Sequence, residues 1–310
     1  MPNIDDLLAD EGAALLRTAG EVRTTLARHA VPLYFFRDTP DPSNYVGQGS
    51  GVLVKILSRY FILTAGHCIS AAGSGKIVVG VLSRTHCFVP ALCRNAYRCD
   101  YGTEHDFGFW EVPAVDASTI KLTDRIFLSE TQIAILTHNE CMARDDWMIL
   151  GGYPGEIAVG QTGVKPGARL LAYSTILSGT REAPVSTIGR VHNGHHVVDL
   201  WVPKTGNLES TVSPPEPISI PSLSGASGGG CWLTGLKGKG AAWLPQDMQL
   251  VGIHSGSCAE VVINNERHVF AREILLGHHL NLIAHEYEDL RQHVASLWPS
   301  INEFPIEISP

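Results

Sequence analysis

Three short segments of the sequence carry residues whose types could together perform nucleophilic catalysis. His67 lies in Thr-Ala-Gly-His-Cys, Asp106 in His-Asp-Phe-Gly-Phe, and Ser227 in Gly-Ala-Ser-Gly-Gly. Serine is a weak nucleophile at its own pKa, so attack on an amide requires an imidazole that accepts its proton and a carboxylate that orients the imidazole. The sequence supplies all three groups, in the order His, Asp, Ser.

The local context of each segment suits this chemistry. An apolar run over 59–64 predicts a buried strand, with His67 in the turn at its end. Asp106 directly precedes a second apolar run, over 107–112. The glycines around Ser227 leave backbone N–H groups open to a developing oxyanion, because no Cβ intrudes there. Gly225 and Ser227 are the predicted donors of this oxyanion hole.

Each segment alone is weak support, since glycine loops, single histidines and strand-capping aspartates are common. Together they resemble the trypsin/chymotrypsin-like serine peptidases, whose triad runs in the same order. The resemblance extends to further motifs and spans about residues 31 to 275: Gly49-Ser-Gly-Val-Leu-Val54, Leu150-Gly-Gly-Tyr-Pro-Gly155 and Leu250-Val-Gly-Ile-His-Ser-Gly256. It implies hydrolysis of a protein or peptide substrate through an acyl-enzyme intermediate, without a cofactor.

Short apolar runs between glycines and prolines predict an all-β domain. These runs cover 49–56, 59–66, 77–83, 107–112, 132–137, 147–152, 168–177, 195–202, 229–233, 250–256 and 268–273. The resemblance implies two six-stranded antiparallel barrels of the chymotrypsin type, with the triad in the cleft between them. We therefore expect an N-terminal helical extension over 1–30, a peptidase domain of two barrels over 31–275, and a C-terminal helix and tail over 276–310.

Both ends of the chain carry apolar residues at helical spacing. The N-terminal stripe comprises Leu8, Leu15, Ala19, Val22 and Leu26, and the C-terminal one Ile283, Tyr287, Leu290, Val294 and Leu297. Both helices are expected to pack on the barrels. For the N-terminal helix, docking of a regulatory partner or self-association is a second interpretation.

Composition indicates a globular enzyme. The chain has 310 residues, 44% hydrophobic and 17% charged, with a formal net charge of −8. The negative charge argues against nucleic acid or an anionic membrane as a partner. The sequence contains no apolar run long enough to span a membrane, and the first thirty residues have no basic start followed by an apolar core. We therefore expect a cytoplasmic protein.

The seven cysteines point to the same compartment, because an odd number cannot all pair. Secreted members of the family that this chain resembles pair the cysteine after the catalytic histidine with one on the preceding strand. Here Gly49-Ser-Gly51 occupies that strand, so Cys68 is expected to be unpaired. The spacing of Cys93 and Cys99 fits no common zinc pattern, so no metal is expected. Cys231 and Cys258 lie where some members of the family that this chain resembles have a disulfide; a bridge and two reduced thiols are both open, and a cytosol favours the thiols.

Substrate selection is expected to depend on Ser222 and His254. Trypsin-like enzymes carry the aspartate that binds Lys or Arg where this chain has Pro221, so that specificity is not expected. Ser222 and His254 instead resemble the hydroxyl and imidazole pair of glutamyl endopeptidases, which predicts cleavage after Glu or Gln. The alternative is that His254 is a hydrogen-bonded strand histidine. The substrate backbone is expected to pair with the edge Ser255-Gly256-Ser257.

Other features bear on regulation and on alternative functions. Ala226 stands where trypsin-like zymogens have the aspartate that pairs with a new N-terminus, so that switch is not available to this chain. The remaining histidines of interest are expected on the surface: His192, His195, His196, His278 and His279. Besides an active serine endopeptidase, two further functions are open: a catalytically silent protein that binds peptides through the cleft, and a scaffold whose terminal helices join an assembly.

Overall fold

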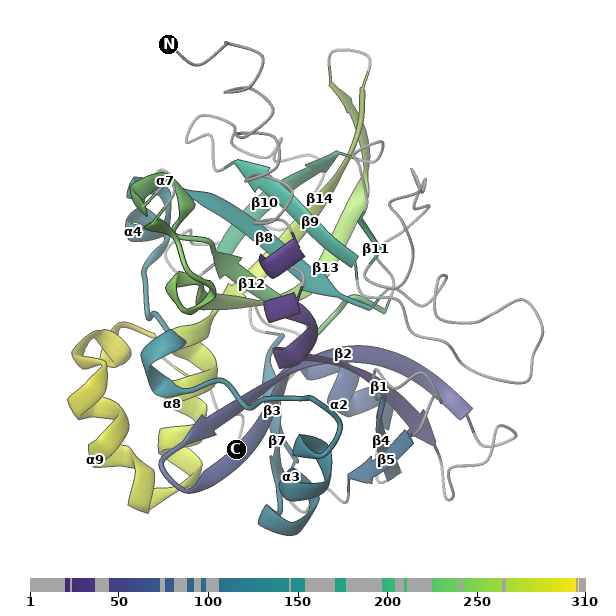
Figure 1. Cartoon of the computed structure of the whole chain (residues 1–310), viewed down its shortest axis with the longest axis vertical. Helices are drawn as coiled ribbons and strands as arrows, with labels where there is room; N and C mark the ends of the chain where they lie inside the picture. The colour runs from purple at the N-terminus through teal and green to yellow at the C-terminus, as the bar shows by residue number, and fades with distance from the viewer. Residues whose placement is uncertain are drawn as a thin grey trace, which may run out of the picture.

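The computed structural model describes most of the chain and contains two antiparallel β-sheets flanked by helices (Figure 1). The described residues are 20–22, 24–36, 45–72, 76–80, 88–91, 96–98, 106–144, 146–153, 171–176, 197–203, 209–210, 225–239, 242–263, 266–304 and 306. Ser222, His192, His195, His196, Cys87, Cys93 and Cys99 lie outside these ranges, as does most of the predicted N-terminal helix.

The first sheet is formed by the N-terminal half of the chain, in the order β5-β4-β1-β2-β3-β7-β6. Its strands are β1 (Ala30–Phe36), β2 (Tyr45–Ile56), β3 (Arg59–Thr64), β4 (Lys76–Gly80), β5 (Phe88–Ala91), β6 (Ala96–Arg98) and β7 (Gly108–Val112). Side chains alternate between the two faces of a strand. In β2, accordingly, Val52 and Val54 join one buried cluster and Leu53 joins another. The centre of this sheet is thus covered on both faces.

The second sheet is formed by the C-terminal half, in the order β10-β14-β13-β12-β8-β9-β11. Its strands are β8 (Trp147–Gly152), β9 (Leu171–Ile176), β10 (Val197–Pro203), β11 (Glu209–Ser210), β12 (Gly230–Leu233), β13 (Gln249–Ile263) and β14 (Glu266–Leu275). Buried residues of both sheets belong to the same cluster, among them Val52 and Phe61 from the first and Trp232 and Leu250 from the second. The two sheets therefore share a core.

The prediction of an all-β protein with two six-stranded barrels is wrong. Each sheet has seven strands in an open order, in which β5 and β6 end the first sheet and β10 and β11 end the second. The described residues also form the helices α2 (Gly66–Ala72), α3 (Ala114–Lys121), α4 (His138–Ala143), α7 (Leu236–Lys239), α8 (Leu276–Glu286) and α9 (Glu288–Leu297). Three short 3₁₀ segments are η2 (Glu130–Gln132), η4 (Pro245–Asp247) and η5 (Pro299–Glu303).

Two of the unexpected helices show why the sequence pattern failed. Helix α3 buries only Ala117 and Ile120, so it has no apolar stripe to reveal it. The apolar run over 132–137, predicted as a strand, instead leads from η2 into α4. Thr137 caps that helix, accepting the N–H of Glu140, whose side chain binds back to the Thr137 N–H. The capping box is a local signal for the start of a helix, but the apolar run before it favours a strand.

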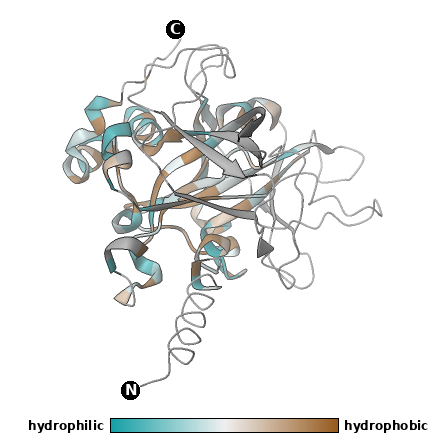
Figure 2. Ribbon diagram, turned by 90° about the horizontal axis from the view of Figure 1, so that it is seen from above, coloured by the Kyte–Doolittle hydropathy of each residue, from teal (hydrophilic) through white to brown (hydrophobic). Residues whose placement is uncertain are grey.

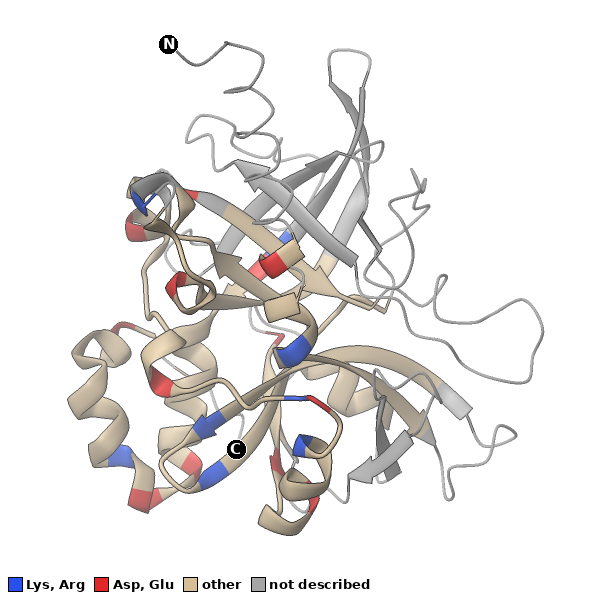
Figure 3. Ribbon diagram, viewed as in Figure 1, with Lys and Arg blue, Asp and Glu red and all other residues tan. Residues whose placement is uncertain are grey.

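The C-terminal segment forms two helices rather than one, and the first of them packs against both sheets. Helix α8 contacts β7 and β13, and α9 packs on α8 (Figure 1). His278 and His279 are fully buried in α8, so their predicted surface position is wrong. In Figure 2 apolar colour follows the central strands, while polar colour lies on the outer helices. Figure 3 shows few charged residues within the described strands.

The described part of the predicted N-terminal helix, residues 20–22 and 24–29, is helical and packs by Val22 and Leu26 into the shared core. Helices of the length and apolarity that a bilayer requires do not occur among the described residues.

Candidate active site

His67 and Asp106 are brought together by the pairing of β3 with β7. Thr64, at the end of β3, pairs with Gly108, at the start of β7. The chain turns into α2 just after Thr64, so His67 lies beside the residue that precedes β7. Gly66 permits this approach, because a Cβ at that position would lie 3.0 Å from the Asp106 Oδ1 atom. Local sequence places each residue at a strand end, and the sheet places the two ends together.

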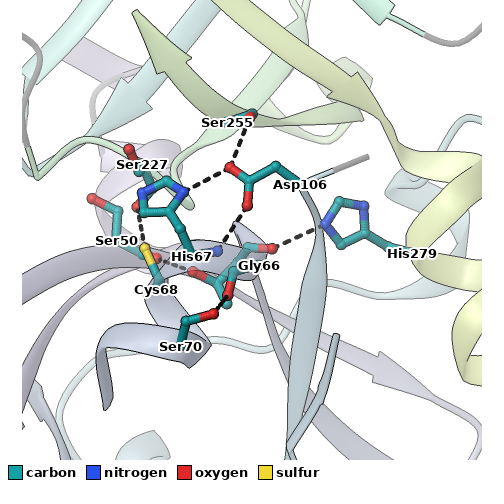
Figure 4. Close-up of polar contacts among 10 residues, drawn as sticks. Ser50, Gly66, His67, Cys68, Ser70, Asp106, Ser227, Ser255 and His279 are labelled. Carbon is teal, nitrogen blue, oxygen red and sulfur yellow. Dashed lines mark hydrogen bonds and ion pairs between the residues drawn. The ribbon is translucent and has the colours of Figure 1, made fainter. Parts of the chain in front are cut away.

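The Asp106 carboxylate receives three hydrogen bonds (Figure 4). The His67 side chain donates from Nδ1 to Oδ2 at 2.6 Å, and its backbone N–H donates to Oδ1 at 2.7 Å. Ser255 donates from Oγ to Oδ2 at 2.9 Å. A proton on Nδ1 leaves Nε2 of the neutral ring as the acceptor, which is the form that a general base requires.

These bonds alter the protonation of both side chains. Burial opposes ionisation of Asp106 most strongly, but the hydrogen bonds from His67 and Ser255 outweigh it and lower the pKa of the carboxyl group. The hydrogen bond to Asp106, followed by the contact with Cys68, raises the pKa of His67. The His67 side chain remains 36% exposed, so substrate and solvent can reach it. The pair is therefore an accessible imidazole beside a stable carboxylate.

Helix α8 supports the strand end that carries His67. His279 donates from Nε2 to the backbone carbonyl of Thr64 at 3.1 Å (Figure 4). Burial lowers the pKa of His279 to about 4, so its ring is neutral around pH 7. His279, which was predicted to lie on the surface, thus links α8 to the end of β3.

Ser227 lies in a tight loop that leads into β12 of the second sheet. The N–H of Gly229 donates to the Ala226 carbonyl at 2.8 Å, and Gly225 and Gly228 have φ of +88° and +89°. At Gly228 a Cβ would lie 1.9 Å from the Ser50 carbonyl oxygen. Only glycine fits there, because both the backbone conformation and the contact exclude a side chain.

The loop is fixed to its surroundings through the backbone of Ser227 and of Gly228. The Ser227 carbonyl accepts the Ser50 N–H at 2.8 Å and the Cys68 thiol at 3.6 Å. The N–H of Gly228 donates to the His254 carbonyl at 2.7 Å. Since Cys68 follows His67 in the chain, these contacts hold Ser227 next to the imidazole, as Figure 4 shows.

The described residues show no hydrogen bond between the Ser227 hydroxyl and the Nε2 atom of His67. This agrees with a catalytic pair without substrate, because nucleophile–base distances are often long until substrate binds. Among the residues that the structure describes, the N–H groups of Gly225 and Ser227 have no acceptor. These are the two donors predicted for an oxyanion. The arrangement can therefore pair a nucleophile with a base and offer two N–H groups to a developing negative charge.

The residues predicted to bind substrate lie in different surroundings. His254 is fully buried and donates from Nδ1 to Glu273 Oε1 at 2.9 Å, while its Nε2 atom has no partner among the described residues. Gly256 and Ser257 pair with β14 on one side, whereas the described pairing of β12 with β13 ends at Ile253. One edge of this segment of β13 is thus without a strand neighbour in the described part of the structure.

Ser255 has a role that the sequence did not reveal. A β-bulge between His254 and Gly256 displaces Ser255 from the regular alternation, and its side chain binds the Asp106 carboxylate instead of facing a substrate. Ser50 is a second residue of the site that the sequence does not indicate, although it lies within the motif Gly49-Ser-Gly51. No local signal relates Ser50 to Gly225, which is 175 positions away.

Cys68, Cys141 and Cys231 are free and buried, so Cys231 forms no bridge. Within the described ranges, no three His, Cys, Asp or Glu side chains gather as a metal site. Comparison with protein-family models and with curated protein sequences gave no match.

Proposed function

We propose that the protein is a serine endopeptidase that hydrolyses peptide bonds through an acyl-enzyme intermediate. The proposal rests on one observation, the Asp106–His67 pair, whose side chains are bonded at 2.6 Å at the ends of β3 and β7 of the first sheet. The glycine loop before β12 of the second sheet places Ser227 beside this pair. This is the relation that activation of a serine hydroxyl requires. The proposal depends on the site, and it does not depend on the closed barrels that the fold lacks.

In the proposed reaction the Ser227 Oγ atom attacks the scissile carbonyl carbon, and His67 accepts the hydroxyl proton on Nε2. Asp106 stabilises the imidazolium, and the N–H groups of Gly225 and Ser227 bind the oxyanion. His67 then donates its proton to the leaving amine, which leaves an ester on Ser227. Water, deprotonated by the same imidazole, hydrolyses the ester and restores the enzyme.

For the substrate we propose cleavage after glutamate or glutamine. The buried Nε2 atom of His254 supports this, because an unpartnered buried ring nitrogen costs roughly 1–3 kcal/mol that a substrate side chain could recover. Since Nδ1 donates to Glu273, Nε2 of the neutral ring would accept a hydrogen bond from a glutamine amide, and it would donate one to a glutamate carboxylate only when the ring carries a second proton. The bond from Nδ1 to Glu273 fixes the ring so that Nε2 faces away from the glutamate. Extended substrate backbone would pair with the edge of β13 at Ser255, Gly256 and Ser257.

We further propose that the enzyme works in a reducing compartment such as the cytoplasm. Three buried thiols without disulfides, at Cys68, Cys141 and Cys231, support this assignment. Burial raises the pKa of Cys141 to about 12, which keeps that sulfur as an unreactive thiol.

A fluorophosphonate probe tests the proposal, since it reacts only with an activated serine. The full chain should be labelled at Ser227, and Ser227→Ala should lose both labelling and peptide cleavage while keeping its Tm. Ser118→Ala, in which an exposed serine of α3 is removed, is the matched control and should behave as wild type. Labelling that persists in Ser227→Ala would refute the assignment. A folded wild type that binds peptides without labelling would indicate the catalytically silent alternative.

A further inference from the structure

Ser50 bonds to both peptide groups that flank the predicted oxyanion hole. Its backbone N–H donates to the Ser227 carbonyl at 2.8 Å, and its hydroxyl donates to the Gly225 carbonyl at 2.9 Å. The hydroxyl also accepts the Tyr153 N–H at 2.8 Å. One side chain on β2 of the first sheet thus fixes the nucleophile loop of the second.

We propose that Ser50 is the positioning residue of the oxyanion hole. This inference rests on the proposed function and adds to it the group that keeps the Gly225 and Ser227 N–H donors in place. Ala226, between the two donors, has no polar side chain that could anchor the loop. Gly225, at φ +88°, has no Cβ to restrict its backbone to one conformation. Without the bond from Ser50, the peptide that follows Gly225 could rotate and carry the donors out of register.

The anchor is itself held by buried groups. Ser50 is fully buried, and its carbonyl accepts the Thr64 hydroxyl at 2.9 Å. Tyr153, whose N–H binds Ser50, is also fully buried, and its hydroxyl accepts a hydrogen bond from the Arg125 Nη1 atom at 3.1 Å. Because Ser50, Thr64 and Tyr153 are all buried, the Ser50 hydroxyl itself has little freedom to exchange its bonds for water.

The same contacts connect the hole to the last turn of the N-terminal helix. Arg125 Nη1 also donates to the carbonyl groups of Ala27 and Ala30, where that helix ends and β1 begins. Arg125 is 2% exposed and lies beside Tyr153. A series of hydrogen bonds therefore links the end of the N-terminal helix to the Gly225 carbonyl, through the Arg125 side chain, the hydroxyl and backbone N–H of Tyr153, and the Ser50 hydroxyl.

Ser50→Ala tests the proposal, because it removes the bond to Gly225 and keeps the backbone bond to Ser227. We expect kcat to fall about 10- to 100-fold with KM nearly unchanged, less than the loss of a hole donor itself. Affinity for a peptide aldehyde should fall by a similar factor, since its hemiacetal oxygen occupies the hole. Ser50→Thr, which keeps the hydroxyl, should restore most of both.

The matched control is Thr234→Val, which removes a fully buried hydroxyl bonded to Asp146 at 3.1 Å, just beyond the end of β12 that lies away from the loop. It should lower Tm as Ser50→Ala does but leave kcat and aldehyde affinity unchanged. If Ser50→Ala does not fold, Ser50→Cys retains the shape with a weak donor and should show the same pattern.

A kcat within about twofold of wild type in the folded Ser50 variant would overturn the proposal, as would a loss confined to KM. A wild type that fails to react with the fluorophosphonate overturns the proposed function itself. The two failures are distinguishable because the first is measured only on an enzyme already shown to be active.

Discussion

Ser255 donates a hydrogen bond from Oγ to the Asp106 carboxylate at 2.9 Å, although 149 residues separate the two in the chain. Asp106 precedes β7 of the first sheet and Ser255 lies on β13 of the second. The carboxylate that orients His67 is therefore completed by the opposite sheet. Both the base and the nucleophile loop therefore depend on how the two sheets dock.

Asp106→Asn should lower kcat on the order of 10⁴-fold with little change in fold. An amide presents an N–H to His67 Nδ1 as readily as an oxygen, so the ring loses the tautomer in which Nε2 accepts a proton. Steady-state kinetics on a peptide substrate measure the effect. Ser255→Ala, which removes only one bond to the same carboxylate, should cost about tenfold or less. An Asp106→Asn enzyme of wild-type activity would exclude Asp106 from the triad.

The pH dependence of kcat/KM should show an ascending limb above pH 6.5, the ordinary pKa of histidine, because the bond to Asp106 raises the pKa of His67 and only the neutral ring is a base. The lowered pKa of Asp106 keeps the carboxylate charged throughout this range. Kinetics from about pH 5 to 10 test this. In Asp106→Asn the limb should move towards lower pH, and a wild-type limb at or below 6.5 would contradict the assignment.

Gly228→Ala should destabilise the protein by about 2 kcal/mol or more and abolish probe labelling. The added Cβ would lie 1.9 Å from the Ser50 carbonyl, at a φ of +89° that alanine rarely adopts. Chemical denaturation and fluorophosphonate labelling measure the two effects. Gly20→Ala is the control, since a Cβ there has no heavy atom within 4 Å. Normal labelling of Gly228→Ala would show that the loop conformation is not required.

His254→Ala should reduce kcat/KM for cleavage after glutamate or glutamine about tenfold or more and flatten the preference in a peptide library. The buried ring nitrogen would no longer be available to the substrate side chain. Glu273→Gln keeps the shape of the site and changes only the group bonded to Nδ1, so it should alter the ratio of glutamate to glutamine cleavage. A wild-type preference for Lys, Arg or large apolar residues would reject this specificity and leave the peptidase proposal intact.

Stability should fall as the pH drops below about 6.5, because burial lowers the pKa of both His29 and His279 to about 4. The unfolded chain binds these protons more readily than the folded one, so each histidine costs about 1.4 kcal/mol per pH unit until about pH 4. Urea denaturation at a series of pH values measures the slope.

The double variant His29→Asn and His279→Gln keeps the donors to Ile126 and Thr64 but cannot be protonated. Its stability should depend less on pH over the same interval. An unchanged slope in the variant would mean that other groups cause the acid sensitivity.

The sequence alone determined which residues are candidates for the chemistry. His67, Asp106 and Ser227 could be identified because their signals are local: an apolar strand before a turn, an aspartate before a strand, and glycines around a serine. The strands β3 and β7 were likewise predicted from apolar runs of a few residues. Such features depend on backbone preferences and on hydrophobic patterning within one element.

Only the tertiary structure decided how the elements meet. The open seven-stranded sheets, the binding of Ser255 to Asp106, the bonds of Ser50 to the nucleophile loop and the burial of His279 behind Thr64 all join segments far apart in the chain. No short window of sequence contains both partners of such a contact. Strand register and the shared core select these pairs, because burial of many apolar side chains outweighs the preference of any one segment.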